Sequence, residues 1–215
     1  MTHRFSTACR RCPRLARHLD QVGEAHPGYH ARPVGPFGPP KARLLVVGLA
    51  PGMHGANRTG RPFTGDHAGI LLYETLHRYG FASRPVSEGA RDGLRLSHCR
   101  ITNAVKCLPP ANRPLPDEVR RCNGYLLGEM SALPAGAAIL ALGVIAHGAV
   151  VTAAGSRKVL HPFRHGARHE LARGIVLFDS YHCSRYNTQT RRLTPPMFRS
   201  VFDAIRQHLS ATGFR

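Results

Sequence analysis

The feature that most constrains the fold of this chain is a repeated alternation of short apolar runs with helical patterns. The clearest run, residues 43–48 (Arg-Leu-Leu-Val-Val-Gly), predicts a strand that is buried on both faces. Further strands are predicted over 99–105, 137–142 and 174–178, and helices over 68–79, from 116 onward, over 144–154 and over 195–209. Because this alternation favours a parallel sheet covered on both faces, we expect an α/β fold: three layers, α/β/α, around a central four-stranded parallel sheet.

The domain organisation is expected to be simple. A length of 215 residues suits one globular domain, and no internal repeat divides it. Residues 1–41 are rich in proline and are predicted to form an irregular N-terminal segment of that single domain, 1–215. The sequence has no apolar stretch that is long and uninterrupted enough for a membrane span, and no apolar core of a signal peptide near its start. We therefore expect a cytoplasmic protein without a membrane partner, and nothing in the sequence favours an obligate dimer over a monomer.

The charge balance points to a polyanionic partner. Thirty Lys and Arg residues against twelve Asp and Glu give a formal net charge of +18. Such an excess cannot be paired internally, so a large positive surface must remain in solvent. An arginine-rich surface can also reflect only the base composition of a genome, but DNA or RNA is the commonest partner of so basic a domain.

Four of the six cysteines are spaced like ligands. Cys9 and Cys12 form a C-x2-C pair, and Cys107 and Cys122 form a second pair that brackets a proline-rich loop and a helix start. In the cytoplasm such cysteines are better explained as metal or cluster ligands than as disulfides. Four thiolates suit either zinc or a [4Fe–4S] cluster, and the spacing leaves both open.

The loop after the first strand, residues 49–66, carries the richest pattern. Its glycines let backbone N–H groups approach a ligand closely. It lacks the Lys and the hydroxyl of a P-loop, so no nucleotide cofactor is expected, and no zinc-deaminase motif is present either. Phe63 is either a stacking platform for a planar ligand or a core residue. Asp66 is placed to cap the next helix and is also able to hold a water molecule.

Two further loops are expected to lie beside this one. In parallel sheets, ligands bind at the carboxyl ends of the strands. Residues 49–66, 103–114 and 180–194 all follow predicted strands. Basic side chains recur on the second and third of these loops, and we expect them to meet phosphates: Lys106, Arg113, Arg185, Arg191 and Arg192.

Taken together, these motifs resemble the uracil-DNA glycosylase superfamily, and within it the iron–sulfur enzymes called type B or family 5. The resemblance covers most of the chain and rests on five segments: Cys9-x2-Cys12-Pro13, residues 48–66, Thr102 to Cys107, Cys122, and the final loop from His182 to Pro195. Two features depart from the usual pattern. The usual His-Pro-Ser is here His182-Cys183-Ser184, with a cysteine in place of the proline, and residues 188–191 replace a more glycine-rich stretch. Enzymes of the related family 4 usually have an acidic residue in the region that corresponds to Ala50 to Gly52. This chain has none there, as expected of type B.

The resemblance implies a role for each part of the candidate site. A [4Fe–4S] cluster would be held by the four spaced cysteines, which favours iron over zinc. Phe63 would stack on an extruded base, Asn103 would read its Watson–Crick edge, and His182 would approach the carbonyl oxygen beside the broken bond. The backbone at Ala50 and Gly52 would cradle the base. With no carboxylate earlier in the loop, Asp66 would position the water.

DNA contacts are expected around the same face. The resemblance places Arg185 and Tyr186 on the loop that presses into the minor groove, and we expect four other residues to take part: Arg58, Arg113, Ser184 and Arg191. The implied activity is that of a monofunctional glycosylase of base-excision repair, acting on uracil and on other deaminated or modified bases such as hypoxanthine, ethenocytosine and 5-hydroxymethyluracil. Three alternatives stay open: a uracil-only, family 4-like enzyme, a lesion-binding protein without catalysis, and a zinc-clamped nucleic-acid binder.

Overall fold

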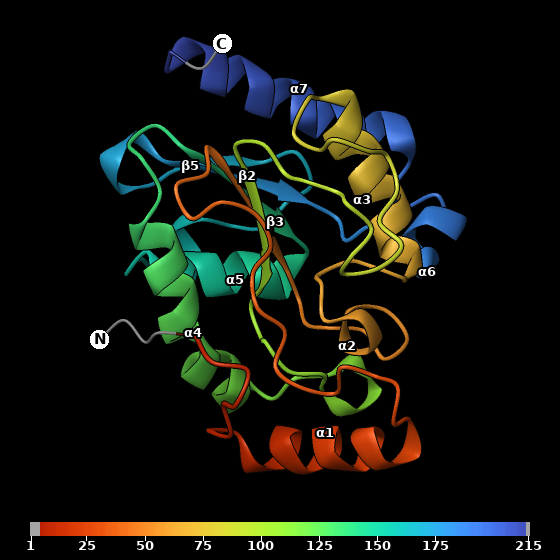
Figure 1. Ribbon diagram of the computed structural model, residues 1–215. Coiled ribbons are helices and arrows are strands. Elements are labelled where there is room, and N and C mark those ends of the chain that lie inside the picture. Colours follow the sequence, from red (N-terminus) through yellow and green to blue (C-terminus); the bar gives the residue numbers. More distant parts are fainter. Residues whose placement is uncertain (1–4, 214–215) are drawn as a thin grey trace.

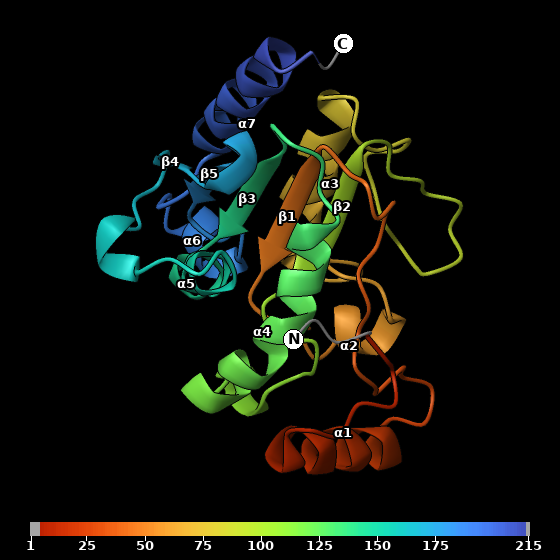
Figure 2. The same ribbon diagram turned by 90° about the vertical axis from the view of Figure 1, so that its left-hand side faces the viewer.

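The computed structural model describes residues 5–213 and has a mostly parallel five-stranded sheet at its centre. The strand order is β2-β1-β3-β5-β4 (Figures 1 and 2). The four parallel strands are β1 (Leu44–Gly48), β2 (Cys99–Asn103), β3 (Ala138–Leu142) and β5 (Val176–Ser180). The expected α/β class is confirmed. The sheet also has a fifth strand, β4 (Arg168–Glu170), which pairs antiparallel with β5 at the edge.

Helices cover both faces of the sheet because the strand side chains alternate between two apolar cores. Leu44 and Val46 pack in the core below α3 (His67–Arg78) and α7 (Pro195–Ala211). Leu45 and Val47 pack in the core below α4 (Pro116–Ser131) and α5 (Val144–Ala153). Figure 1 shows the sheet between these two pairs of helices.

The N-terminal segment differs from the expectation of an irregular stretch. It contains α1 (Pro13–Ala25), which lies at the opposite end of the molecule from α7 in both views (Figures 1 and 2). The first of its prolines occupies the first helical position, where a missing N–H costs nothing, so it begins the helix instead of breaking it. Leu15, Leu19 and Val22 form the buried face of α1. The proline count therefore misled the prediction for this segment.

The remaining elements are short and lie in the connections. They are α2 (Ala56–Thr59), α6 (Arg185–Gln189) and three single 3-10 turns at Pro110–Asn112, Lys158–Leu160 and Ala172–Gly174. The connection 180–194, expected as a polar loop, thus contains a helix. Within residues 5–213, no helix is long and apolar enough to cross a membrane.

The sheet brings the three candidate loops to one edge. Gly48 at the end of β1 lies opposite Asn103 at the end of β2, and Leu142 at the end of β3 lies opposite Ser180 at the end of β5. Because these four strands are parallel, the loops that follow them leave from the same edge. The site described next lies there.

Candidate active site

A cavity of about 420 Å³ opens at this edge of the sheet. Each of the three loops contributes to its wall. The six residues that the sequence assigned to catalysis or base binding all line it: Ala50, Gly52, Phe63, Asp66, Asn103 and His182. The structure therefore brings together residues that are up to 132 positions apart in the chain, counting from Ala50 to His182.

Three residues approach one another closely beside the cavity: Gly48 at the end of β1, Asn103 at the end of β2, and Phe63 in the loop after β1. A Cβ atom on Gly48 would lie 2.5 Å from Asn103 Oδ1 and 2.5 Å from Phe63 Cζ, so only glycine fits there. The Asn103 side chain is buried, and its amide Nδ2 finds no hydrogen-bond partner among residues 5–213. An unpaired buried donor is costly unless a ligand satisfies it, which marks Asn103 as a binding group.

Phe63 is held in an unusual backbone conformation beside that donor. Its φ is +55°, and its ring centroid lies 5.9 Å from that of His182 with the planes 27° apart. A bulky residue at positive φ persists only when its surroundings fix it.

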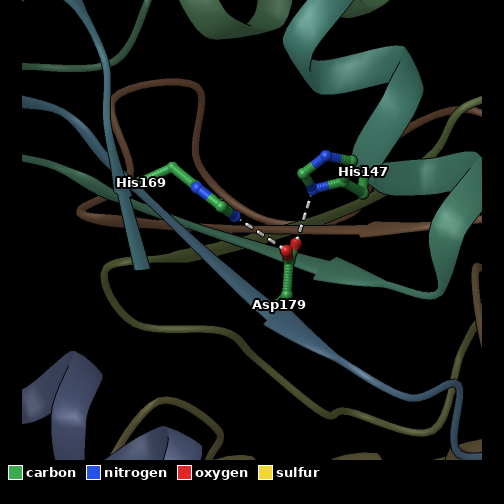
Figure 3. Close-up of side chains that lie close together, drawn as sticks. All are labelled: His147, His169 and Asp179. Atoms are coloured by element: carbon green, nitrogen blue, oxygen red, sulfur yellow. Dashed lines mark hydrogen bonds and ion pairs between the residues drawn. The ribbon is translucent and has the colours of Figure 1, made fainter. Parts of the chain in front are cut away.

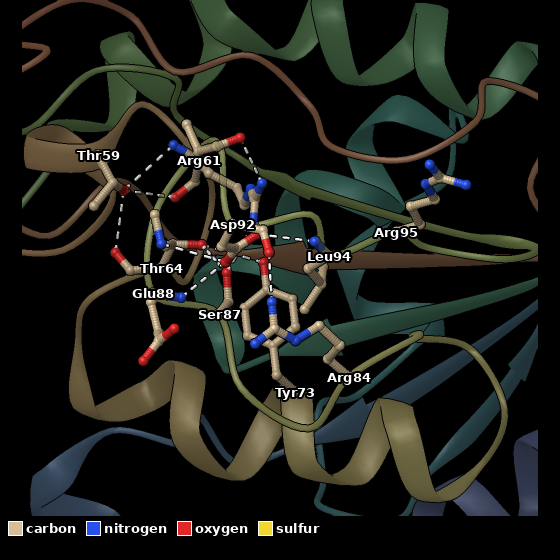
Figure 4. A network of polar contacts seen from close by, with 12 residues as sticks. Thr59, Arg61, Thr64, Tyr73, Arg84, Ser87, Glu88, Asp92, Leu94 and Arg95 are labelled. Atoms are coloured by element: carbon tan, nitrogen blue, oxygen red, sulfur yellow. Dashed lines mark hydrogen bonds and ion pairs between the residues drawn. The ribbon is translucent and has the colours of Figure 1, made fainter.

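A polar network fixes the loop on either side of Phe63 (Figure 4). Arg61 donates to Asp92 Oδ1 at 2.7 Å and to Ser87 Oγ at 3.1 Å, and both charged side chains are buried. The hydroxyls of Thr64 and Ser87 are 2.7 Å apart. These bonds join loop 59–64 to the connection between α3 and β2.

The position of Asp66 suits both roles that the sequence suggested for it, capping a helix and holding a water molecule. It is the N-cap of α3, and its Oδ1 accepts a hydrogen bond from the Gly69 N–H at 3.0 Å. Its Oδ2 lies beside the glycines of the first loop: a Cβ on Gly55 would be 2.5 Å from it, and one on Gly52 would be 3.5 Å from it. Burial raises the pKa of this carboxyl, although backbone hydrogen bonds oppose the shift.

His182 faces the same cavity from the loop after β5. Burial lowers the pKa of its imidazole to about 4, so the ring is neutral at pH 7 and carries one N–H donor. The backbone around it is fixed by the short helix α6: Asn187 Nδ2 donates to the His182 carbonyl at 2.8 Å, and Ser184 Oγ caps the helix. Cys183, which replaces the usual proline, is fully buried.

The residues assigned to DNA contact divide into two groups. Ser184 and Arg185 line the cavity mouth, and Tyr186 beside them is 70% exposed. The others lie exposed on the surface, at Arg58 on α2, at Arg113 after the 110–112 turn and at Arg191 after α6.

Lys106, which the sequence suggested as a phosphate contact, is instead buried. Its ammonium group contacts Thr102 Oγ1 and lies 2.8 Å from Glu129 Oε1 on α4. A paired cation that is 1% exposed cannot meet a DNA backbone, so this prediction was wrong. Its position in a loop near the site gave no sign of the distant carboxylate.

The cavity also contains residues that the sequence did not single out. His67 and Asn112 line it, and His67 Nε2 lies 3.0 Å from Thr188 Oγ1, which joins α3 to α6 across the cavity mouth. Asn112 has a φ of +56° at the tip of the second loop. The sequence offers one weak signal for these two residues: Asn112 lies in the candidate loop 103–114, and His67 directly follows the candidate loop 49–66.

A second site gathers the four spaced cysteines at the junction of α1, α4 and the loop after β2. Cys9, Cys12, Cys107 and Cys122 line one pocket with the apolar Leu15, Ala16 and Pro33 and the basic Arg11 and Arg121. The backbone N–H of Lys106 donates to Cys122 Sγ, and the Tyr125 hydroxyl donates to Cys9 Sγ, both at 3.3 Å.

Four cysteine thiolates fit either tetrahedral zinc or a [4Fe–4S] cluster. The basic side chains of Arg11 and Arg121 in the same pocket suit an anionic group.

The fold and the cavity can now be compared with known proteins. The sequence profile of the uracil DNA glycosylase superfamily matches residues 36–206, which include all four parallel strands and the cavity. This chain therefore belongs to the uracil DNA glycosylase superfamily.

Similar proteins narrow the assignment. A type-5 uracil-DNA glycosylase of Thermus thermophilus is 50% identical over 203 residues, 91% of this chain and 91% of that protein. One of Mycobacterium bovis is 43% identical over 204 residues, 91% of this chain and 76% of that protein. A type-4 uracil-DNA glycosylase of Archaeoglobus fulgidus is 40% identical, but over only 94 residues, 43% of this chain. Within the superfamily the chain is a type-5 uracil-DNA glycosylase.

Proposed function

We propose that this protein flips uracil out of DNA into the 420 Å³ cavity and hydrolyses its N-glycosidic bond, as a monofunctional enzyme of base-excision repair. The observation that carries the proposal is the chemistry of the cavity wall. An unpaired amide donor on Asn103, a neutral imidazole on His182 and an aromatic face on Phe63 meet within one space. A flat polar base offers a partner to each of them.

Extrusion must precede the reaction because an intact duplex hides the glycosidic bond. A mispaired or deaminated base is the cheapest to extrude, which contributes to selectivity. Phe63 then offers its face to the base, and the amide of Asn103 bonds to the base edge. The positive φ of Phe63 and the network around Arg61 support this role, because they hold the ring before the base arrives.

Breaking the C–N bond moves negative charge onto the base and positive charge onto the sugar. The useful catalytic group is therefore a donor aimed at the base oxygen. His182 supplies one, and the backbone N–H groups of loop 49–53, apart from Pro51, which has none, supply others. A well-placed donor of this kind is worth about 3–4 kcal/mol of transition-state stabilisation in other enzymes. The low pKa of His182 supports donation from a neutral ring.

Asp66 has the second role, holding the water that attacks the sugar. Its Oδ1 is committed to the cap of α3, while Oδ2 faces the glycines of the first loop. Because the sugar cation is strongly electrophilic, a strong general base is less important than the donors. Loss of Asp66 should therefore cost less activity than loss of His182.

DNA binding is proposed for the surface around the cavity mouth. Arg185, Ser184 and Tyr186 on or next to α6 would press into the minor groove, and Arg58, Arg113 and Arg191 would meet phosphates. The high net charge of +18 supports such a partner. Each phosphate contact should contribute about 0.9 to the slope of log affinity against log salt, so a salt-independent affinity would contradict this assignment.

A [4Fe–4S] cluster is proposed for Cys9, Cys12, Cys107 and Cys122. The N–H donor to Cys122 Sγ, the O–H donor to Cys9 Sγ and the nearby arginines all suit an anionic cluster. When bound, the cluster would supply structural cross-linking between α1 and the rest of the fold. A colourless protein that contains zinc in place of iron would contradict this assignment.

The range of bases is proposed to extend beyond uracil, to hypoxanthine, ethenocytosine and 5-hydroxymethyluracil. The lack of a carboxylate between Ala50 and Gly52 supports a site that is less specialised for uracil. Excision measured on duplexes and single strands that contain each base tests this. Release of uracil alone would make the enzyme family 4-like, and binding without abasic sites would make it a lesion reader.

Variants test the assignment of roles in the same assay. His182→Ala should lose more activity than Asp66→Ala, and His77→Ala on the exposed part of α3 is the matched control. An inactive Asp66→Ala beside an active His182→Ala would reverse the roles. We also propose that the whole chain, 1–215, acts as one monomeric domain in the cytoplasm. A dimeric mass in light scattering would contradict the monomer.

A further inference from the structure

A second cluster of chemically active side chains lies on the other face of the sheet from α3, outside the cavity (Figure 3). His147 of α5 and His169 of β4 both contact the carboxylate of Asp179 on β5. His147 Nδ1 is 2.8 Å from Asp179 Oδ1, and His169 Nε2 is 3.1 Å from Asp179 Oδ2. The side chain of Asp179 is fully buried, and those of the histidines are 3% and 10% exposed.

The hydrogen bonds of His147 leave one ring nitrogen facing the carboxylate. Its Nε2 lies 2.7 Å from the backbone carbonyl of His161, and a carbonyl only accepts, so Nε2 is the donor there. Its Nδ1 then faces an oxygen of Asp179 at 2.8 Å. Two lone pairs at that distance repel unless a proton or a metal ion lies between them.

We propose that His147, His169 and Asp179 bind a divalent metal ion of the zinc class. Two imidazole nitrogens and one carboxylate oxygen are a donor set that zinc favours. Their ligand atoms all lie within 4.8 Å of one another. Bonds of about 2.0–2.1 Å in a tetrahedron separate neighbouring ligands by roughly 3.4 Å. The ligand atoms lie from 2.8 Å to at most 4.8 Å apart, so they need shifts of up to roughly 1 Å to close on an ion.

The surroundings of the cluster match those of metal sites in two respects. A ligating histidine usually donates its other ring N–H to a carbonyl or carboxylate, as His147 does to His161. His147 also lines a cavity of about 510 Å³ together with His161 and Phe163, so one of the three proposed ligands borders a space open to solvent.

The ion would join three elements of the fold, β4, β5 and α5. β4 is a three-residue edge strand, and its one neighbour in the sheet is β5. A metal shared by β4, β5 and α5 fixes this edge three residues before His182. The proposed role is structural, and it does not depend on the base that the active-site cavity accepts.

The test is zinc binding by the whole, iron-containing protein. After dialysis against Zn²⁺ alone and removal of free metal, wild type should retain one zinc ion per chain more than Asp179→Asn or His169→Gln. Comparing variants cancels any zinc at the cysteines, and His77→Gln, which removes an exposed histidine from α3, should bind like wild type. Loss of one ligand should weaken zinc binding by more than about 100-fold, because loss of even an outer partner costs 10–100-fold.

Thermal unfolding provides the second readout. Zn²⁺ should raise the melting temperatures of wild type and of His77→Gln. It should leave the melting temperatures of Asp179→Asn and His169→Gln unchanged. Circular dichroism and uracil release, retained in His169→Gln, show that the variant is folded. Equal zinc content and equal melting shifts in wild type and the ligand variants would overturn the proposal, because a proton shared between His147 and Asp179 would then account for their contact.

Discussion

Gly48→Ala tests how closely the base-binding groups are held. The added Cβ would lie 2.5 Å from Phe63 Cζ and 2.5 Å from Asn103 Oδ1, where an ordinary carbon contact is about 3.5–4.0 Å. Both side chains must therefore move by roughly 1 Å. A misplacement of that size costs about 100-fold in rate when positioning matters, so we expect uracil release to slow by about two orders of magnitude.

The same change should also lower the stability of the fold. Forcing one extra methyl group into a packed site costs about 1–3 kcal/mol, which lowers the melting temperature of a domain of this size by roughly 2–12 °C. The assay is single-turnover uracil release at 25 °C, with melting followed in parallel. Gly28→Ala is the matched control, since no atom lies within 4 Å of its added Cβ. A wild-type rate in Gly48→Ala would refute the proposed roles of Phe63 and Asn103.

Three further predictions follow from individual contacts. Asp92→Asn should destabilise the fold by about 3–5 kcal/mol at pH 7, because it leaves the buried Arg61 unpaired. Burial raises the pKa of Asp92, but hydrogen bonds from Arg61 and backbone N–H groups outweigh it and hold this pKa well below its usual range. The destabilisation by Asp92→Asn, measured by urea unfolding, should therefore shrink only as the pH falls below about 4. A destabilisation that does not change with pH would contradict this prediction. The rate of uracil release should fall as the pH is lowered through the pKa of Asp66, which burial raises above the ordinary value of about 3.9. If Asp66→Asn shows the same fall in rate at low pH as wild type, Asp66 does not have the proposed role. Cys107→Ala should lose iron and expose α1 to protease, whereas full iron content would remove Cys107 from the ligand set.

Much of the sheet could be predicted because parallel strands buried on both faces are continuous apolar runs. The expected strands at 43–48 and 137–142 begin within one residue of β1 and β3 and end where those strands end. β4 could not be found in this way, since its residues are polar, largely exposed and lie at the edge of the sheet. Helix α1 was missed for a different reason, because the prolines that follow it led the whole segment 1–41 to be predicted as irregular.

The sequence could predict which loops form the candidate site, because the parallel sheet determines where they lie. It could not predict which of their side chains are buried. Strand direction alone placed three loops at one edge, and Phe63, Asn103 and His182 line one cavity there. Whether a charged loop residue is free or paired depends on residues distant in sequence. Lys106 therefore looked available for DNA, although Glu129 neutralises it inside the fold.

The most direct test of the central claim is the release of free uracil from a U·G duplex, measured together with abasic-site formation in a single turnover. Wild type should produce both in equal amounts. The amide of Asn103 should be required, so Asn103→Ala should bind the duplex but cleave the glycosidic bond far more slowly. Tight binding of the duplex by wild type with neither free uracil nor abasic sites would contradict a hydrolytic role for this cavity.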